Sequence, residues 1–165
     1  EVRPFIDGKF LLTGSALCGG RAYTMLEKFF RKFVVAAGMK NEAVYDVMNE
    51  LVNNSEDCGL FVDCRFCGTR DEPEIKGSVL GITESNFTPD NLIRGFLEGM
   101  AQELFDFYKD MNLSGISHIV GSGNAIKKIP AFVKILSEKF GMSIEVSNVR
   151  EEAAYGACLF AGRPC

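Results

Sequence analysis

Apolar residues recur every three or four positions in the first part of the chain, which predicts two amphipathic helices. The first is expected over residues 21–37, and Gly38 is a typical stop signal at its end. The second is expected around residues 44–52, with Asn41 as the residue that caps it. The two segments therefore predict a helical pair that follows the first strand.

A longer apolar stripe between residues 93 and 111 predicts a central helix. The sequence Thr-Pro-Asp at residues 88–90 opens it with a capping hydroxyl, a proline suited to the first turn and an early acid. Gly95 and Gly99 lie one turn apart on this helix. Because glycine has no side chain, we expect another element to pack closely at that point.

Short apolar runs bounded by turn residues predict the strands. They are expected within residues 8–17, 60–62, 77–82, 116–120 and 143–146, with further helices over 127–140 and from about 151. The last helix is rich in alanine and glycine, so it is expected to lie close against the sheet or another helix. This alternation predicts an α/β fold, and with no linker or internal repeat we interpret residues 1–165 as a single domain.

Composition and charge narrow the classes of function. The chain has 165 residues, 47% of them hydrophobic, and a formal net charge of −4, so no basic field favours nucleic acid as a partner. No apolar run is long enough to span a membrane, and residues 1–10 lack the apolar core of a signal peptide. We therefore expect a cytoplasmic protein without a membrane partner, and we interpret its start as a cut in a longer chain.

Six cysteines are present, too thinly spread for a disulfide framework, and we expect reduced thiols. Cys64 and Cys67 have the spacing of zinc ligands, but a second pair is lacking. The single histidine, His118, lies on a predicted strand far along the chain and is expected in the interior. Packed or partly exposed thiols are thus favoured over zinc, and no metal ligands are nominated.

Two glycine turns each follow a predicted strand and precede a predicted helix, at residues 18–20 and 120–124. Glycine lets a ligand approach the backbone, and free N–H groups at a helix start favour anionic oxygens. Either turn alone is most simply a connection, but together they favour a nucleotide-binding protein.

An NAD-binding domain of an oxidoreductase is one alternative. The sequence GSGNAI at residues 121–126 resembles a dinucleotide fingerprint, and Glu145 ends the next predicted strand, where a ribose-binding acid is expected. However, Ile126 occupies the position of the third glycine, and the turn comes late in the chain. A P-loop is excluded because its spacing of glycine and lysine is absent.

Taken in order, these motifs resemble the C-terminal domain of the FGGY carbohydrate kinases, and most closely its sedoheptulokinase-like members. The segments that carry the resemblance are GSALCGGRAYTMLEKFF, GTRDEP with GSVLGIT, FTPDNLIRGFLEGMAQELFDFY, VGSGNAIKKIP and VREEAAYGACLFAG. The resemblance implies a ribonuclease-H-like domain of the actin-like ATPase superfold, a mixed sheet flanked by helices.

The resemblance also implies a function: ATP-dependent phosphorylation of a sugar hydroxyl, with a ketose such as sedoheptulose as the expected acceptor and with ATP and Mg²⁺ as cofactors. This chain would supply the nucleotide-binding half. The sugar-binding N-terminal half, with the catalytic aspartate, would lie upstream, so no catalytic residue is assigned and the chain is expected to be inactive alone. The residues implied at the nucleotide are Gly20, Tyr23, Thr24, Gly121, Ser122, Gly123, Asn124 and Lys127.

A second alternative function stays open: a noncatalytic, sugar-kinase-like binding module. Assembly of the chain into a homo-oligomer also stays open.

The loop GTRDEP departs from the commoner family pattern, because Thr69 stands in place of an acid and Glu72 shifts Pro73 one position later. A surface or interdomain salt bridge is therefore the favoured role for Arg70.

Overall fold

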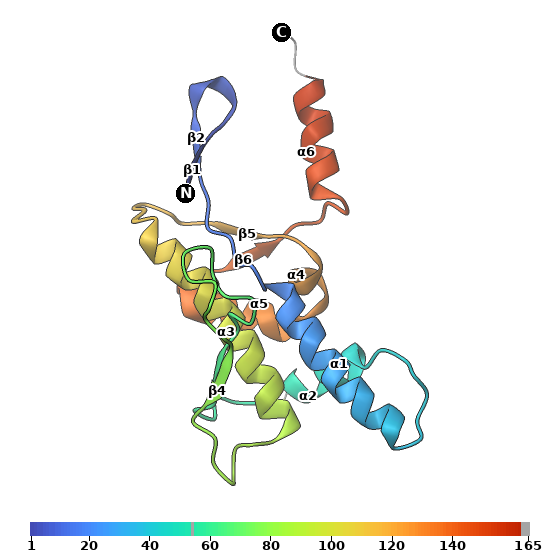
Figure 1. The fold of residues 1–165 in the computed structure, drawn as a ribbon. Coiled ribbons are helices and arrows are strands. Elements are labelled where there is room, and N and C mark those ends of the chain that lie inside the picture. The colour runs from blue at the N-terminus through green and yellow to red at the C-terminus, as the bar shows by residue number, and fades with distance from the viewer. Residues whose placement is uncertain (54, 163–165) are drawn as a thin grey trace.

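The computed structural model describes residues 1–53 and 55–162 (Figure 1). The elements alternate much as the sequence predicts. In chain order they are β1 (Val2–Pro4), a short 3-10 turn (Ile6–Gly8), β2 (Phe10–Leu12), α1 (Gly20–Ala36), α2 (Tyr45–Asn53), β3 (Phe61–Asp63), β4 (Ser78–Leu80), α3 (Pro89–Asp110), β5 (Ile119–Gly121), α4 (Asn124–Lys128), α5 (Pro130–Phe140), β6 (Ile144–Val146) and α6 (Glu152–Ala161).

Helix α3 is the centre of the core, as its apolar stripe predicts. It packs against α1, α2, α5 and β3. Ile93 and Leu97 of α3 are fully buried together with Met48 and Val52 of α2 and Val62 of β3. Burial of these side chains is the main source of stability, since each contributes about 1.5–3 kcal/mol when removed from water.

The two glycines of α3 allow β3 to approach the helix backbone. A Cβ atom at Gly95 would lie 2.8 Å from Leu60 Cδ2, and one at Gly99 would lie 2.0 Å from the Val62 carbonyl oxygen. Neither position has room for a side chain. The close packing expected at this pair of glycines is therefore confirmed.

The strands pair in mixed directions but do not join into one continuous sheet within the described residues. β1–β2 and β3–β4 are antiparallel pairs, and β5–β6 is a parallel pair connected through α4 and α5. Each strand has three residues, so each pair is short. The hairpin β1–β2 projects from the helical body, and every residue of its two strands is exposed (Figure 1).

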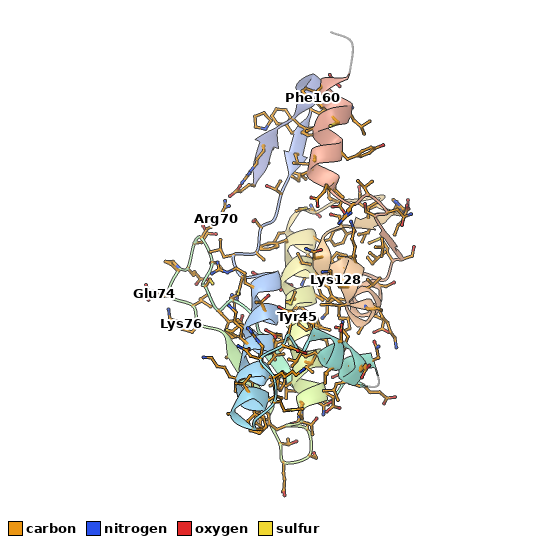
Figure 2. All side chains as sticks on the ribbon, turned by 90° about the vertical axis from the view of Figure 1, so that its right-hand side faces the viewer. Tyr45, Arg70, Glu74, Lys76, Lys128 and Phe160 are labelled. Atoms are coloured by element: carbon orange, nitrogen blue, oxygen red, sulfur yellow. The ribbon has the colours of Figure 1, made fainter. Side chains whose placement is uncertain are left out.

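Helix α6 differs from the prediction. It projects from the same end of the molecule as the hairpin, has no buried residue, and exposes Tyr155, Leu159 and Phe160 (Figures 1 and 2). A Cβ at Gly156 would meet no atom within 4 Å. The expectation that its small residues pack closely is therefore wrong, because no other element within residues 1–53 and 55–162 covers the helix.

Helix boundaries also differ in detail. The helix expected over 127–140 is broken at Ile129, because Pro130 starts a new helix in its first-turn position. Asn41 does not cap α2; its side-chain oxygen accepts a hydrogen bond from Arg31 (3.2 Å). Thr88 is the N-cap of α3 as expected, but its hydroxyl makes no capping bond.

Among the described residues, no helix combines the length and apolarity that a membrane crossing requires.

Candidate functional site

The starts of α1 and α4 meet at one cavity of about 700 Å³, and α2 forms its third side. This volume is in the range of small-molecule sites. Tyr45 of α2 and Lys128 of α4, both labelled in Figure 2, line this cavity. The lining residues are Gly20, Tyr23, Thr24, Ala43, Tyr45, Asp46, Asn49, Asn124, Ala125, Lys128 and Ile129.

Glycine is required where each turn leads into its helix. Gly19, the N-cap of α1, has φ 38° and ψ −127°, and Gly123, the N-cap of α4, has φ 89° and ψ 167°. Residues that carry a side chain rarely adopt these backbone conformations. Gly20 then places the first turn of the 17-residue helix α1 at the cavity, where the positive end of the helix dipole favours an anion.

Two tyrosines form an aromatic wall. The rings of Tyr23 and Tyr45 are stacked with centroids 6.0 Å apart at 22°. The Tyr45 hydroxyl donates to Thr24 Oγ1 (3.3 Å), and the Tyr23 hydroxyl donates to Asn49 Oδ1 (3.2 Å). Burial, with a smaller contribution from Tyr45, raises the pKa of Tyr23 to about 12, so this hydroxyl is a neutral donor at pH 7.

An ion pair between buried Glu27 and half-buried Arg31 holds the segment that leads into α2. Glu27 of α1 is 2% exposed, lies 3.1 Å from the Arg31 guanidinium, and accepts a hydrogen bond from the Val44 backbone N–H (3.2 Å). Arg31 in turn donates to Asn41. These contacts fix residues 41–44 against α1, and so they set where α2 begins beside the cavity.

Four of the eight predicted nucleotide residues line the cavity: Gly20, Tyr23, Thr24 and Asn124. Gly121, Ser122 and Gly123 form the turn that leads to Asn124 but are not part of the lining. Lys127 points elsewhere. Its Nζ lies 2.6 Å from Glu152 Oε1 and donates to the Val149 carbonyl, so it ties α4 to the start of α6.

The residues that sequence reasoning missed come from α2 and the end of α4. Tyr45 and Asn49 are one helical turn apart, on the same side of α2. This spacing of polar side chains is visible in the sequence, beside the apolar positions Met48 and Val52. It does not say which other helix that side faces, because α2 reaches the glycine turns only through tertiary packing.

The other candidate chemistries have less support. Cys64 is buried and its thiol donates to the Phe96 carbonyl (3.4 Å), and burial raises the pKa of this thiol to about 12. A thiol held neutral in this way is a poor nucleophile and metal ligand. In the part of the chain that the structure describes, no cluster of three or more His, Cys, Asp or Glu side chains is placed to hold a metal ion.

His118 and Glu145 also take roles other than those expected. His118 is exposed, contrary to its predicted interior position, and its Nε2 lies 3.1 Å from Glu145 Oε2. Glu145 is therefore engaged at the surface and does not line the cavity. Arg70 forms a surface ion pair with Glu1, in agreement with the salt-bridge role favoured for it.

Solved structures show which fold class this arrangement belongs to. A xylulose kinase from Bifidobacterium adolescentis superposes with a TM-score of 0.63 at 23% identity, over 88% of this chain and 28% of that one. A xylulose kinase from Rhodospirillum rubrum gives a TM-score of 0.67 at 19% identity, over 88% of this chain and 30% of that one. The chain has the actin-like ATPase fold of these kinases and spans less than a third of their length.

The family follows from the sequence itself. Residues 5–165 match the C-terminal domain of the FGGY family of carbohydrate kinases. The chain belongs to this family. No curated protein gives a significant match. The family match favours a sugar kinase over the NAD-binding alternative.

Proposed function

We propose that this chain is the nucleotide-binding half of an ATP-dependent carbohydrate kinase and that it binds ADP or ATP in the cavity between α1, α2 and α4. The observation that carries the proposal is that the two helices that follow the glycine turns, α1 and α4, line one cavity, in a chain of the FGGY family. The tyrosine wall provides an apolar surface for a purine base. The first turn of α1 provides the positive end of the helix dipole, which favours anionic oxygens.

Charge distinguishes this cavity from a second one near the hairpin. The second cavity, of about 360 Å³, is lined by four carboxylate side chains and one arginine, Arg70. The four carboxylates are those of Glu1, Asp71, Glu103 and Asp110. Such a lining repels phosphate groups. The cavity between α1, α2 and α4 combines Lys128 with a single lining carboxylate, Asp46, and so it suits a nucleotide better.

This lining also fits a magnesium ion that arrives with the nucleotide. Mg²⁺ keeps several waters and is commonly held by substrate phosphates and one or two carboxylates. Asp46 is the carboxylate available in the described lining. When bound, the ion neutralises phosphate charge, while the chain's own residues hold and orient the nucleoside.

The acceptor in this proposal is a sugar hydroxyl, and more narrowly a ketose such as sedoheptulose. The FGGY family supports a sugar acceptor, whereas the ketose rests on the sequence resemblance to sedoheptulokinase-like members. A separate N-terminal half of the kinase would bind the sugar and provide the catalytic base. This half is the partner that we propose for this chain. We propose a cytoplasmic location for the assembled kinase.

The first experiment is calorimetric titration of the chain with Mg-ADP, Mg-ATP and NAD. We expect adenine nucleotides to bind and NAD to bind more weakly. In a Gly123→Val variant we expect the Kd for Mg-ADP to rise at least about tenfold, because valine strains the turn beside Asn124.

Gly38→Val is the matched control for this substitution. Gly38 has φ 87° against 89° for Gly123, and a Cβ at either position meets no atom within 4 Å. Both variants therefore place a side chain in open space at a positive φ, but Gly38 lies at the far end of α1, away from the cavity. Equal losses of affinity in both variants, or tighter binding of NAD than of ADP, would contradict the proposal.

A further inference from the structure

Asn49 connects two walls of the cavity through the two ends of one side chain. Its Oδ1 accepts the hydrogen bond from the Tyr23 hydroxyl of α1 (3.2 Å), and its Nδ2 donates to the carbonyl oxygen of Lys128, the last residue of α4 (3.1 Å). Asn49 itself belongs to α2. A single chain of hydrogen bonds therefore runs from the helix after the first glycine turn to the helix after the second.

We propose that Asn49 is a positioning residue that fixes the separation of α1 and α4 and thereby sets the width of the nucleotide cavity. This inference rests on the proposed function, because it assigns Asn49 a role in nucleotide affinity. It goes beyond the family resemblance, which points to the glycine turns and to the first turn of α1. Asn49 acts through Tyr23 and Lys128, so the proposal does not require it to touch the nucleotide.

The two partners of Asn49 both lack an alternative within their own helices. The Tyr23 side chain is 4% exposed, and its hydroxyl needs an acceptor. The Lys128 carbonyl lies at the end of α4, where Pro130 has no N–H and the Phe132 N–H bonds to Ile129 instead. Asn49 satisfies both groups.

The chemistry requires an amide at this position. A side-chain amide accepts through its oxygen and donates through its nitrogen, whereas a carboxylate only accepts and an ammonium group only donates. Leucine has a similar size to asparagine but does neither. Replacement of Asn49 by leucine therefore removes both connections while it keeps most of the volume.

A second bond shows what is specific to Asn49. Tyr45, one turn earlier on α2, donates to Thr24, and this bond joins α2 to α1 without reaching α4. Among the side chains of the described lining, Asn49 makes the hydrogen bond that reaches α4. Without it, α4 loses this hydrogen-bonded restraint on its distance from α1, and a nucleotide must restore the spacing at the expense of binding free energy.

The test measures Mg-ADP affinity by calorimetry, at a temperature well below the lowest Tm of any variant. We expect Asn49→Leu to raise the Kd about tenfold and Asn53→Leu to leave it unchanged. Asn53 is the matched control because it is an exposed asparagine on the same helix and does not line the cavity. A purely structural role would lower the Tm of Asn49→Leu without changing the Kd, and that result would overturn the inference.

Tyr23→Phe keeps the test decisive if Asn49→Leu does not fold. It removes one hydroxyl, retains the ring, and cuts the same chain of hydrogen bonds at its α1 end. We expect a several-fold rise in Kd, and in the double variant no further loss beyond that of Asn49→Leu, because both substitutions break one connection. Wild-type affinity in Tyr23→Phe, or full additivity in the double variant, would overturn this inference but not the proposed function. Failure of the wild-type chain to bind any adenine nucleotide would overturn the proposed function and this inference with it.

Discussion

At the scale of single residues, the walls of the cavity are joined by hydrogen bonds between polar side chains. Tyr23 is the clearest case, since its hydroxyl lies among packed helices and donates to Asn49. Burial disfavours the ionised phenolate and raises the pKa of Tyr23 to about 12, from an ordinary value of 10.0. The fold therefore depends on a protonated tyrosine, and stability must respond to alkaline pH.

The sign of this response is fixed by the order of ionisation. Between pH 10 and 12 the unfolded chain loses the Tyr23 proton while the folded chain retains it, so the free energy of unfolding falls as pH rises. The contribution is about 1.4 kcal/mol per pH unit across that window. Tyr23→Phe lacks this titration. We expect it to be less stable than wild type by about 1 kcal/mol at pH 8, through loss of one hydrogen bond.

Urea denaturation of both proteins at pH 8, 10 and 11 measures this difference. The stability of Tyr23→Phe should fall less steeply with pH, so the two curves converge above pH 10. Groups other than Tyr23 titrate equally in both proteins and cancel in the comparison. Parallel curves over the whole range would show that the Tyr23 hydroxyl is not held in its protonated form by the fold.

At the scale of elements, the helices could be predicted from the sequence more completely than the strand pairing or the site. α1 and α3 follow from local periodicity and stop signals, and the glycine pair of α3 correctly predicts close packing. Strand pairing depends on contacts between residues far apart in the chain, and periodicity contains no information on such contacts. The same reason explains α6, whose small residues suggest packing that no neighbouring element provides.

For the candidate site, too, local sequence signals could be predicted and contacts between distant segments could not. The two glycine turns are local signals, and Gly20 and Asn124 were predicted and do line one cavity. The α2 wall was missed because it comes from a separate segment of the chain. Tyr45 and Asn49 acquire their role only when the Glu27–Arg31 pair places the start of α2 beside α1. Lys127 shows the converse, since its position suggests a phosphate contact but its side chain pairs with Glu152.

The packing of α3 on β3 gives a direct test at this scale. Gly99→Ala would place a Cβ 2.0 Å from the Val62 carbonyl oxygen and 3.0 Å from Cys64 Sγ, so helix and strand must separate. We expect a loss of about 1–3 kcal/mol and a Tm lower by several degrees. Gly156→Ala is the control, because it lies inside helix α6 in open space and should be neutral or stabilising by up to about 1 kcal/mol. Equal Tm values for the two variants would show that α3 and β3 do not pack as described.

At the scale of the whole molecule, the chain holds the proposed nucleotide cavity but only part of what phosphoryl transfer needs. It spans 28% and 30% of the two xylulose kinases that it resembles in fold. Transfer requires the attacking hydroxyl and the γ-phosphate in line, with a base to accept the proton. No residue of the described cavity other than Asp46 carries a carboxylate, and the proposal assigns the sugar and the base to a separate half.

The last prediction therefore separates binding from catalysis. We expect the 165-residue chain to bind Mg-ADP but to show no ketose-dependent formation of ADP from ATP. A longer protein that includes the proposed N-terminal half should form ADP with a ketose, since closure of two halves places the reacting groups together and excludes water. Coupled measurement of ADP release with sedoheptulose, xylulose and no sugar distinguishes these outcomes. An appreciable ketose-dependent rate from the short chain would contradict the proposal that the two halves carry separate parts of the reaction. Activity of the longer protein that is lost in Gly123→Val but kept in Gly38→Val would tie the reaction to this cavity.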